Sequence, residues 1–360
     1  MQINKILWSV LMMSVLVLFT ACEEDVIQTG PQLTGDPGNV QFFTLSEGSW
    51  NGNNSTLAFC DFTKTTKTIK SDIFLEVNNR GLGDMANDMA IYGSKLYIVV
   101  NGSNTVEVID VHSKALVKQI PMVNEEGEGR SPRKVAFADG KAYISSFDGT
   151  VVKIDTTTLA IEDWVLCGSN PEGLCVANGK LYVSNSGGLN YPDYDNTVTV
   201  IDLASFEAIK TITVDTNPGR ILADSEGDVY VATLGNYDDV FSKLHRISSV
   251  TDELIESFED IQLVDFSIYQ DKAYLYNFGS SVQVFDCLSE TLIQEDFLQG
   301  TNDIQAINGL SINPANGDIY LTDAKDYTIF GALYGYDKNG NLKFNINEIG
   351  LNPKVVVFVD

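Results

Sequence analysis

Histidine and basic residues are scarce in this chain, and each shortage narrows what the protein can do. Only two histidines occur, His112 and His245, and neither has a nucleophile or a carboxylate at a useful spacing. A His-based catalytic triad and a His-rich metal site are therefore not expected. The 23 basic residues are outnumbered by 49 acidic ones, which gives a formal net charge of −26. Such an acidic chain repels polyanions, so we expect no nucleic-acid partner.

Cysteine is also sparse, and no CxxC spacing occurs among the five cysteines. Cys60 occupies a strand position that holds Ile or Phe elsewhere in the chain, so we expect a buried apolar filler. Cys167, Cys175 and Cys287 have no His nearby, and their spacing leaves open whether any two of them pair. We expect no cofactor and no metal. A Ca²⁺ site is chemically conceivable in two acidic loops but lacks the fixed spacing of an EF-hand; its ligands would be Asp193, Asp195, Asp238 and Asp239.

A long apolar run occurs only at the N-terminus, where residues 1–21 are typical of a secretory signal peptide. Small residues directly before Cys22 resemble the lipobox of bacterial lipoproteins, so Cys22 is the predicted lipidation site. The alternative is an ordinary signal peptide with a chance cysteine. Acidic residues follow at 23–25, similar to a surface-export signal. We therefore expect a lipid-anchored outer-membrane protein exposed at the cell surface, with residues 22–39 as its lipidated cysteine and flexible tether.

The rest of the chain repeats one unit of short strands. A line with a central Tyr recurs six times, at Tyr97, Tyr143, Tyr182, Tyr230, Tyr274 and Tyr320, with a mean period of about 45 residues. An alternating apolar line recurs seven times, most often ending in Asp, at positions 57–61, 106–110, 151–155, 198–202, 244–248, 282–286 and 333–337. This pattern predicts an all-β fold, a seven-bladed β-propeller over residues 40–360.

The first blade lacks its innermost line, which turns up at the C-terminus in residues 351–358. We therefore predict that the C-terminal strand completes blade 1 and closes the ring. Residues 68–74 are expected to form its outer strand. Three dipeptides predict type I′ hairpin turns: Asp139-Gly140, Asn178-Gly179 and Asn316-Gly317. The repeated Asp that ends the third strands is interpreted as a turn cap, because one carboxylate repeated at one structural position is architecture.

Long, unusual loops fall into two classes, those between blades and those between the second and third strands of a blade. The strand directions place both classes on one face. Aromatic, amide and arginine side chains on loops over a rigid scaffold are typical of a platform that binds a large, polar ligand. The ligand-binding residues predicted by loop position are Trp50, Arg80, Asn87, Arg133, Asn170, Tyr191, Tyr194, Tyr237, Phe241, Tyr327 and Phe330. For any single aromatic, packing within its own loop is the simpler alternative.

The repeated Asn-Pro, Asn-Gly-Lys-Leu-Tyr-Val and Val-x-Val-Ile-Asp motifs resemble the YncE-like seven-bladed propellers. Residues 45–50, 53–55 and 81–89 are similar to those of lipid-anchored surface propellers of the BtuG type. This resemblance implies a non-catalytic protein that captures cobalamin, or a related corrinoid, and passes it to a TonB-dependent outer-membrane transporter. A glycan-binding or structural surface-layer protein is the second hypothesis. A propeller enzyme, such as a Ca²⁺-dependent lactonase or a quinoprotein-like dehydrogenase, ranks last.

Overall fold

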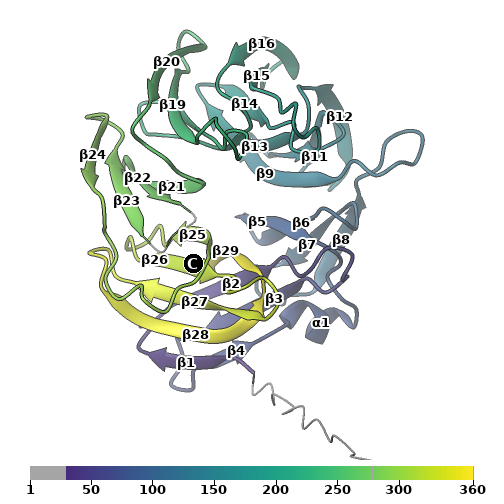
Figure 1. Ribbon diagram of the computed structural model, residues 1–360. Helices are drawn as coiled ribbons and strands as arrows, with labels where there is room; N and C mark the ends of the chain where they lie inside the picture. The colour runs from purple at the N-terminus through teal and green to yellow at the C-terminus, as the bar shows by residue number, and fades with distance from the viewer. Residues whose placement is uncertain (1–29, 278, 280, 360) are drawn as a thin grey trace, which may run out of the picture.

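The computed structural model describes residues 30–277, 279 and 281–359. The predicted signal peptide and the lipidation site Cys22 lie outside the described residues. Seven antiparallel sheets stand in a ring around a central axis, as Figure 1 shows. The predicted all-β, seven-bladed propeller is therefore confirmed.

Each blade contributes four strands in sequence order from the axis outward, except that the first blade begins with the last strand of the chain. The innermost strands are β29 (Pro353–Val359), β5 (Ala86–Tyr92), β9 (Pro132–Ala138), β13 (Pro171–Ala177), β17 (Pro218–Ala223), β21 (Asp265–Tyr269) and β25 (Ile307–Ile312). The second strands are β2 (Gln41–Ser46), β6 (Lys95–Val100), β10 (Lys141–Ser146), β14 (Lys180–Asn185), β18 (Asp228–Thr233), β22 (Lys272–Tyr276) and β26 (Ile319–Asp323).

The third strands are β3 (Thr56–Asp61), β7 (Thr105–Asp110), β11 (Thr150–Asp155), β15 (Thr197–Asp202), β19 (Lys243–Ser248), β23 (Val282–Asp286) and β27 (Phe330–Tyr336). The outermost strands are β4 (Thr68–Lys70), β8 (Leu116–Pro121), β12 (Ile161–Leu166), β16 (Glu207–Thr213), β20 (Glu253–Phe258), β24 (Thr291–Gln294) and β28 (Leu342–Leu351). The second and third strands are mostly buried because neighbouring blades cover both of their faces.

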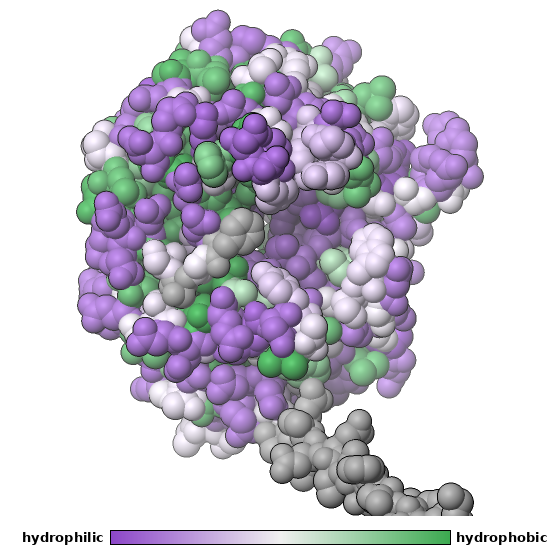
Figure 2. All heavy atoms as spheres, in the orientation of Figure 1, coloured by the Kyte–Doolittle hydropathy of each residue, from purple (hydrophilic) through white to green (hydrophobic). Residues whose placement is uncertain are grey.

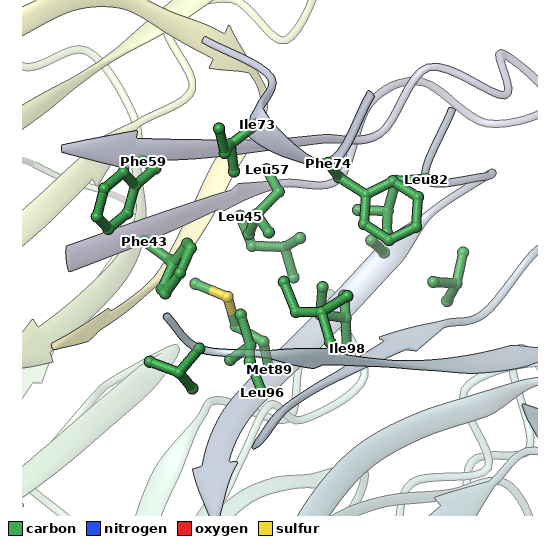
Figure 3. Close-up of a cluster of buried hydrophobic side chains, with 14 residues drawn as sticks. Phe43, Leu45, Leu57, Phe59, Ile73, Phe74, Leu82, Met89, Leu96 and Ile98 are labelled. Carbon is green, nitrogen blue, oxygen red and sulfur yellow. The ribbon is translucent and has the colours of Figure 1, made fainter. Parts of the chain in front are cut away.

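The hydrophobic core is divided into layers that lie between adjacent blades. Between the first two blades, Phe43 and Leu45 of β2 face Leu96 and Ile98 of β6, and Met89 packs among them (Figure 3). The repeated tyrosines of the second strands are all buried in such layers. Each layer buries the apolar faces of two adjacent sheets against each other, and closure of the ring gives the first and last blades such a layer as well.

The ring closes between the two ends of the chain, as predicted. Strand β29 pairs antiparallel with β2, from Gln41 opposite Val359 to Ser46 opposite Pro353. A second contact between the two ends of the chain was not predicted, because residues 22–39 were expected to be a flexible tether. Strand β1 (Gln32–Gly35) instead pairs with β28 and adds a fifth strand to blade 7. Its Leu33 packs on the core layer between blades 7 and 1.

The predicted outer strand at residues 68–74 is only partly correct. Strand β4 ends at Lys70, and the short helix α1 (Ile73–Asn78) follows. Asp72 explains the change, because its carboxylate accepts a hydrogen bond from the Leu75 backbone N–H at 3.1 Å and caps the helix. Phe74 of the helix is fully buried against blade 1.

Most of the predicted turn chemistry is confirmed. The dipeptides Asp139-Gly140 and Asn178-Gly179 both have positive φ at each residue. At Asn316-Gly317 only the glycine does, because the wider turn is organised by Asn313, whose carbonyl accepts from both backbone N–H groups. The third-strand aspartates cap their turns, as shown by the bonds from Ser113 N to Asp110, from Thr158 N to Asp155, from Ser205 N to Asp202 and from Ser289 N to Asp286.

Candidate functional site

The innermost strands carry β-bulges close to their first residues. In β9 the register shifts between Ile144 and Ser146 of the partner strand, so Arg133 and Lys134 both lie opposite Ser145. Similar shifts occur in β5, β13, β17, β25 and β29. A regular strand sends successive side chains to opposite faces, whereas a bulge can direct two neighbours the same way. The bulges therefore bring Arg133 and Lys134 to one pocket on the propeller axis.

Serine hydroxyls tie neighbouring bulges together. Ser145 Oγ accepts from the Lys134 backbone N–H at 3.1 Å and donates to the Glu172 carbonyl of the next blade at 2.6 Å. Ser184 Oγ repeats this one blade further, where it accepts from Gly173 N at 2.9 Å and donates to Gly219 O at 2.5 Å. Gly173 has no room for a side chain, because a Cβ there would collide with the Gly219 carbonyl. These hydrogen bonds join the backbone of the innermost strands β9, β13 and β17 at the floor of the pocket.

The pocket has a volume of about 400 Å³ and opens on the face that carries the long loops. Both predicted loop classes line it, for instance Tyr194 and Tyr237 from loops between second and third strands, and Asn217 from a connection between blades. Figure 2 shows the hollow near the centre of the ring, where hydrophilic residues gather. Below it a second cavity of about 430 Å³ continues down the axis between the innermost strands. We call the two together the axial funnel.

Charged side chains are concentrated at the floor of the axial funnel. Arg133 makes two bonds to the Glu172 carboxylate, at 2.8 and 2.9 Å, and Lys354 contacts Glu47 at 2.9 Å. Burial opposes ionisation of Glu172, but the Arg133 guanidinium outweighs it and holds the pKa of this carboxyl below its usual value. Burial also opposes ionisation of Glu47, but the Lys354 ammonium outweighs it and lowers the pKa of Glu47. These carboxylates are therefore ionised and paired.

Tyrosines form the rim of the pocket. The rings of Tyr194 and Tyr237 meet edge to face at 6.2 Å, and Tyr191 continues the row at 6.0 Å from Tyr194. Tyr237 and Tyr327 have φ values of 61° and 65°, which are unusual for bulky residues. Such conformations cost on the order of 1–3 kcal/mol each and gather at functional sites. The loops hold these two rings at the pocket despite that cost.

Four of the predicted ligand-binding residues line the pocket: Arg133, Tyr194, Tyr237 and Tyr327. Asn87 lies one contact away, with its amide between Glu47 Oε1 at 2.6 Å and Arg133 Nη1 at 2.7 Å. The side chains of Tyr191 and Phe241 are exposed but are not among the lining residues, and the same holds for Trp50 and Phe330. Their role in binding stays a prediction.

Two predicted residues have structural contacts instead. Asn170 is buried, donates to the Phe147 carbonyl at 2.9 Å and accepts from Leu189 N at 3.0 Å, so it organises a loop. Arg80 pairs with the buried Glu107 at 2.6 Å. Both side chains are occupied away from the pocket.

The predicted ligand-binding residues did not include the remaining charged residues that line the pocket, which are Lys134, Glu172, Arg220, Asp265 and Lys354. A signal was present: charged residues follow the proline that opens an innermost strand, at Arg133, Glu172 and Lys354. A charge at this otherwise apolar strand position indicates a residue that faces a wet axis. The alternation rule concealed it, because the bulges change the direction of these side chains.

His245 and the described cysteines lie within the blades. His245 is fully buried in β19 between the hydroxyls of Thr233, at 2.9 Å, and Ser257, at 2.8 Å, and burial lowers its pKa. Cys60 is buried, as predicted. The four described cysteines are free thiols, and burial raises the pKa of Cys175 to about 12. Among the described residues, no three His, Cys, Asp or Glu side chains are placed to hold a metal ion.

Fold and site together define a seven-bladed β-propeller with a charged, tyrosine-rimmed funnel on its axis. The chain belongs to the DUF5074 family, described as a domain of unknown function, which matches residues 41–358. No curated protein matches the sequence. In residues 30–359, gaps at 278 and 280 aside, no helix is long and apolar enough to cross a membrane.

Solved structures with the same fold have diverse functions. A quinonprotein alcohol dehydrogenase-like protein from Bacteroides thetaiotaomicron has a TM-score of 0.64 at 17% identity, over 89% of this chain and 78% of that one. The dihydro-heme d1 dehydrogenase NirN has a TM-score of 0.59 at 12% identity, over 91% and 77%. BamB from Moraxella catarrhalis has 0.53 at 14% identity, over 87% and 82%. These likenesses show the fold, which hosts both enzymes and non-enzymes.

Proposed function

We propose that this chain is a non-catalytic binding protein that takes a polar small molecule into the axial funnel. The observation that carries the proposal is the funnel itself, a ligand-sized pocket with a tyrosine rim above a rigid floor of paired charges. Pockets of this volume and mixed lining are typical of small-molecule sites. Because the floor is built on innermost strands tied by Ser145 and Ser184, its polar groups are positioned before the ligand arrives.

A binding role is favoured over catalysis by the state of the floor groups. The Glu172 and Glu47 carboxylates are paired with cations, which makes them poor general bases. The described thiols, such as Cys175, have raised pKa values that suppress the nucleophilic thiolate. The paired charges of the floor and the tyrosine rings of the rim suit a site that binds a ligand and releases it without chemical change.

The proposed ligand is cobalamin or a related corrinoid. A flat macrocycle fringed with amides can lie against the edges of Tyr194 and Tyr237 while its amides bond to the polar floor, the upper part of the ligand resting on the loops above the pocket. A glycan is the second candidate, because exposed rings such as Trp50 and Tyr191 suit sugar faces. The family resemblance of residues 45–50 and 81–89 favours the corrinoid.

The proposal includes the cellular setting of this binding. The protein is displayed on the outer face of the outer membrane by a lipid on Cys22 and passes its ligand to a TonB-dependent transporter. The sequence around Cys22 supports this setting. In cells, Cys22→Ser is expected to abolish lipid labelling and to release the protein from the membrane fraction, and unchanged membrane retention would contradict the anchor.

The deciding experiment is isothermal titration of the purified protein with cyanocobalamin. Saturable one-to-one binding is expected, weakened in Tyr237→Ala, which removes a ring from the rim of the pocket. Binding should be unchanged in Trp164→Ala, because this exposed aromatic residue lies on the outermost strand β12, away from the pocket. The protein used should retain residues 30–39, because β1 belongs to blade 7. Absence of binding by the wild-type protein would refute the corrinoid, and a glycan panel would then test the second candidate.

A further inference from the structure

The axial funnel gathers cationic side chains in a protein that is acidic as a whole. Four cationic side chains line the upper pocket against two carboxylates, Glu172 and Asp265. The cations are Arg133, Lys134, Arg220 and Lys354. The chain as a whole has a formal net charge of −26. Asp88 lines the lower cavity and Glu47 contacts Lys354, so the four cations face four carboxylates and the funnel is close to neutral, whereas the protein as a whole is strongly negative. An anionic group therefore meets less repulsion in the funnel than at the exterior.

Three of these four cations have an acidic partner within 4 Å. Arg133 pairs with Glu172, Lys354 with Glu47 at 2.9 Å, and Arg220 with Asp265 at 3.4 Å. Lys134 forms no ion pair with any residue that the structure describes, and its ammonium group has one hydrogen bond, to the Asn87 carbonyl, at 3.3 Å. Lys134 is therefore the one cation of the floor whose charge is not directly neutralised by the described protein.

An ammonium group without a counter-charge is costly to hold in a protein interior. Burial lowers the pKa of Lys134, and the positive charges of Lys354 and Arg220 act in the same direction against the attraction of Asp88. Two of the three donor hydrogens of the ammonium lack a described partner, and the group borders both cavities of the axial funnel. A ligand in either cavity can reach it.

We propose that Lys134, with Lys354 and Arg220 beside it, forms a subsite for an anionic group of the ligand, a carboxylate or a phosphate. This inference rests on the proposed binding function and adds a ligand class to it. The incoming anion accepts hydrogen bonds from the free ammonium hydrogens and supplies the missing negative charge. Acidic ligands that cannot descend the funnel meet the negative exterior instead, so the arrangement selects for an anion at the buried end of the ligand.

The test uses inorganic phosphate as the probe and Lys134→Gln as the variant. Glutamine keeps much of the side-chain length and a donor for the Asn87 carbonyl but removes the charge. Lys118→Gln is the matched control, because Lys118 is exposed on the outermost strand β8. Thermal unfolding is measured with increasing phosphate against chloride at equal ionic strength, since a ligand that binds the native state raises the midpoint.

The midpoint of the wild-type protein and of Lys118→Gln should rise with phosphate, whereas the dependence should be lost or weakened about tenfold in Lys134→Gln, the loss expected for one charge-assisted hydrogen bond. Lys134→Arg should retain it. Without phosphate, Lys134→Gln should unfold at the wild-type temperature or above, because an unneutralised buried charge has been removed. An equal phosphate response in all four proteins would overturn the subsite.

The corrinoid titration separates this inference from the function on which it rests. If phosphate stabilises the wild-type protein through Lys134 while cyanocobalamin does not bind, the anion subsite is supported and the corrinoid is refuted as the ligand. If cyanocobalamin binds and phosphate has no Lys134-dependent effect, the anion subsite falls and the binding function stands.

Discussion

Removal of residues 355–360 should open the propeller ring, because these residues provide nearly all of the pairing between β29 and β2. Within this segment Val356 is buried, and the ring of Phe358 lies 4.7 Å from that of Tyr320 in blade 7 and 6.3 Å from that of Phe42 in blade 1. Phe358 thus contacts the two blades that meet at the seam. The truncation removes both the ladder of blade 1 and a contact across the closure.

The expected loss is comparable to the whole stability of an ordinary domain. Burial of a valine and of a phenylalanine side chain contributes about 1.5–3 kcal/mol each. The ladder of five paired residues adds about 1 kcal/mol for each hydrogen bond. The total is on the order of 9 kcal/mol, against a typical unfolding free energy of about 5–15 kcal/mol. The milder Phe358→Ala should cost about 2–3 kcal/mol, since this ring is only partly buried.

Urea unfolding followed by circular dichroism measures both effects. Phe358→Ala should shift the midpoint to lower urea with an unchanged slope, and the truncated protein should lose a cooperative transition. Val250→Ala is the control, because Val250 is 79% exposed in a turn and its loss should change stability by less than about 0.5 kcal/mol. A truncated protein with the midpoint of the parent would refute closure by β29.

Three further predictions address the site, the turns and the thiols. Tyr237→Phe should retain most of the ligand affinity, whereas Tyr237→Ala should lose about 1 kcal/mol or more in titration calorimetry, because the ring provides the contact; equal affinities would remove the rim from the site. At neutral pH Asp202→Ala should unfold at lower urea than the wild type, because the hydrogen bond from Ser205 N holds the pKa of Asp202 below its usual value. This stabilisation is present above the unfolded-state pKa of about 4 and is lost as the pH falls toward the folded-state pKa, so the difference between the two proteins should shrink in acid. A difference that does not change with pH would contradict the capping role. The thiol of Cys175 borders the lower cavity of the axial funnel, but burial raises its pKa to about 12 and suppresses the reactive thiolate. It should therefore react with a thiol reagent at pH 8 much more slowly in the native protein than in urea, and equal rates would contradict the raised pKa.

The fold was predictable because alternating apolar and polar residues, which are typical of β-strands, recur in seven similar units, six of which carry a tyrosine in the second strand. Features that interrupt this pattern were the ones missed. Asp72 starts a helix where alternation predicts a strand, and four residues around Leu33 become a strand only because β28 offers an unpaired edge. Pairing partners far apart in the sequence decide such segments.

The rim of the candidate site was predictable, whereas Arg133 was the one charged residue of its floor that was predicted. Tyr194 and Tyr237 lie in long polar loops, where an aromatic residue indicates a binding surface because it has no core to pack into. Lys134 stands inside a strand, and only the bulge opposite Ser145 explains how it joins its neighbour Arg133 at the pocket. The loop of Trp50 shows the converse: the backbone N–H groups of Asn51 and Asn53 bond to the Asp84 carboxylate of the next blade connection, and Trp50 stays outside the pocket.

The fifth strand of blade 7 has a mechanical consequence. The chain enters the propeller at β1, whose four residues pair with Phe344–Asn347. A pulling force on the segment before residue 30 therefore loads this short ladder and the ion pair of Asp36 with Lys67 before it reaches β2, which pairs with β29. We expect strand β1 to separate from β28 first, which would free additional chain while the seven blades stay paired. Up to the force at which these contacts of β1 break, we expect the pairing of β2 with β29 to bear no load.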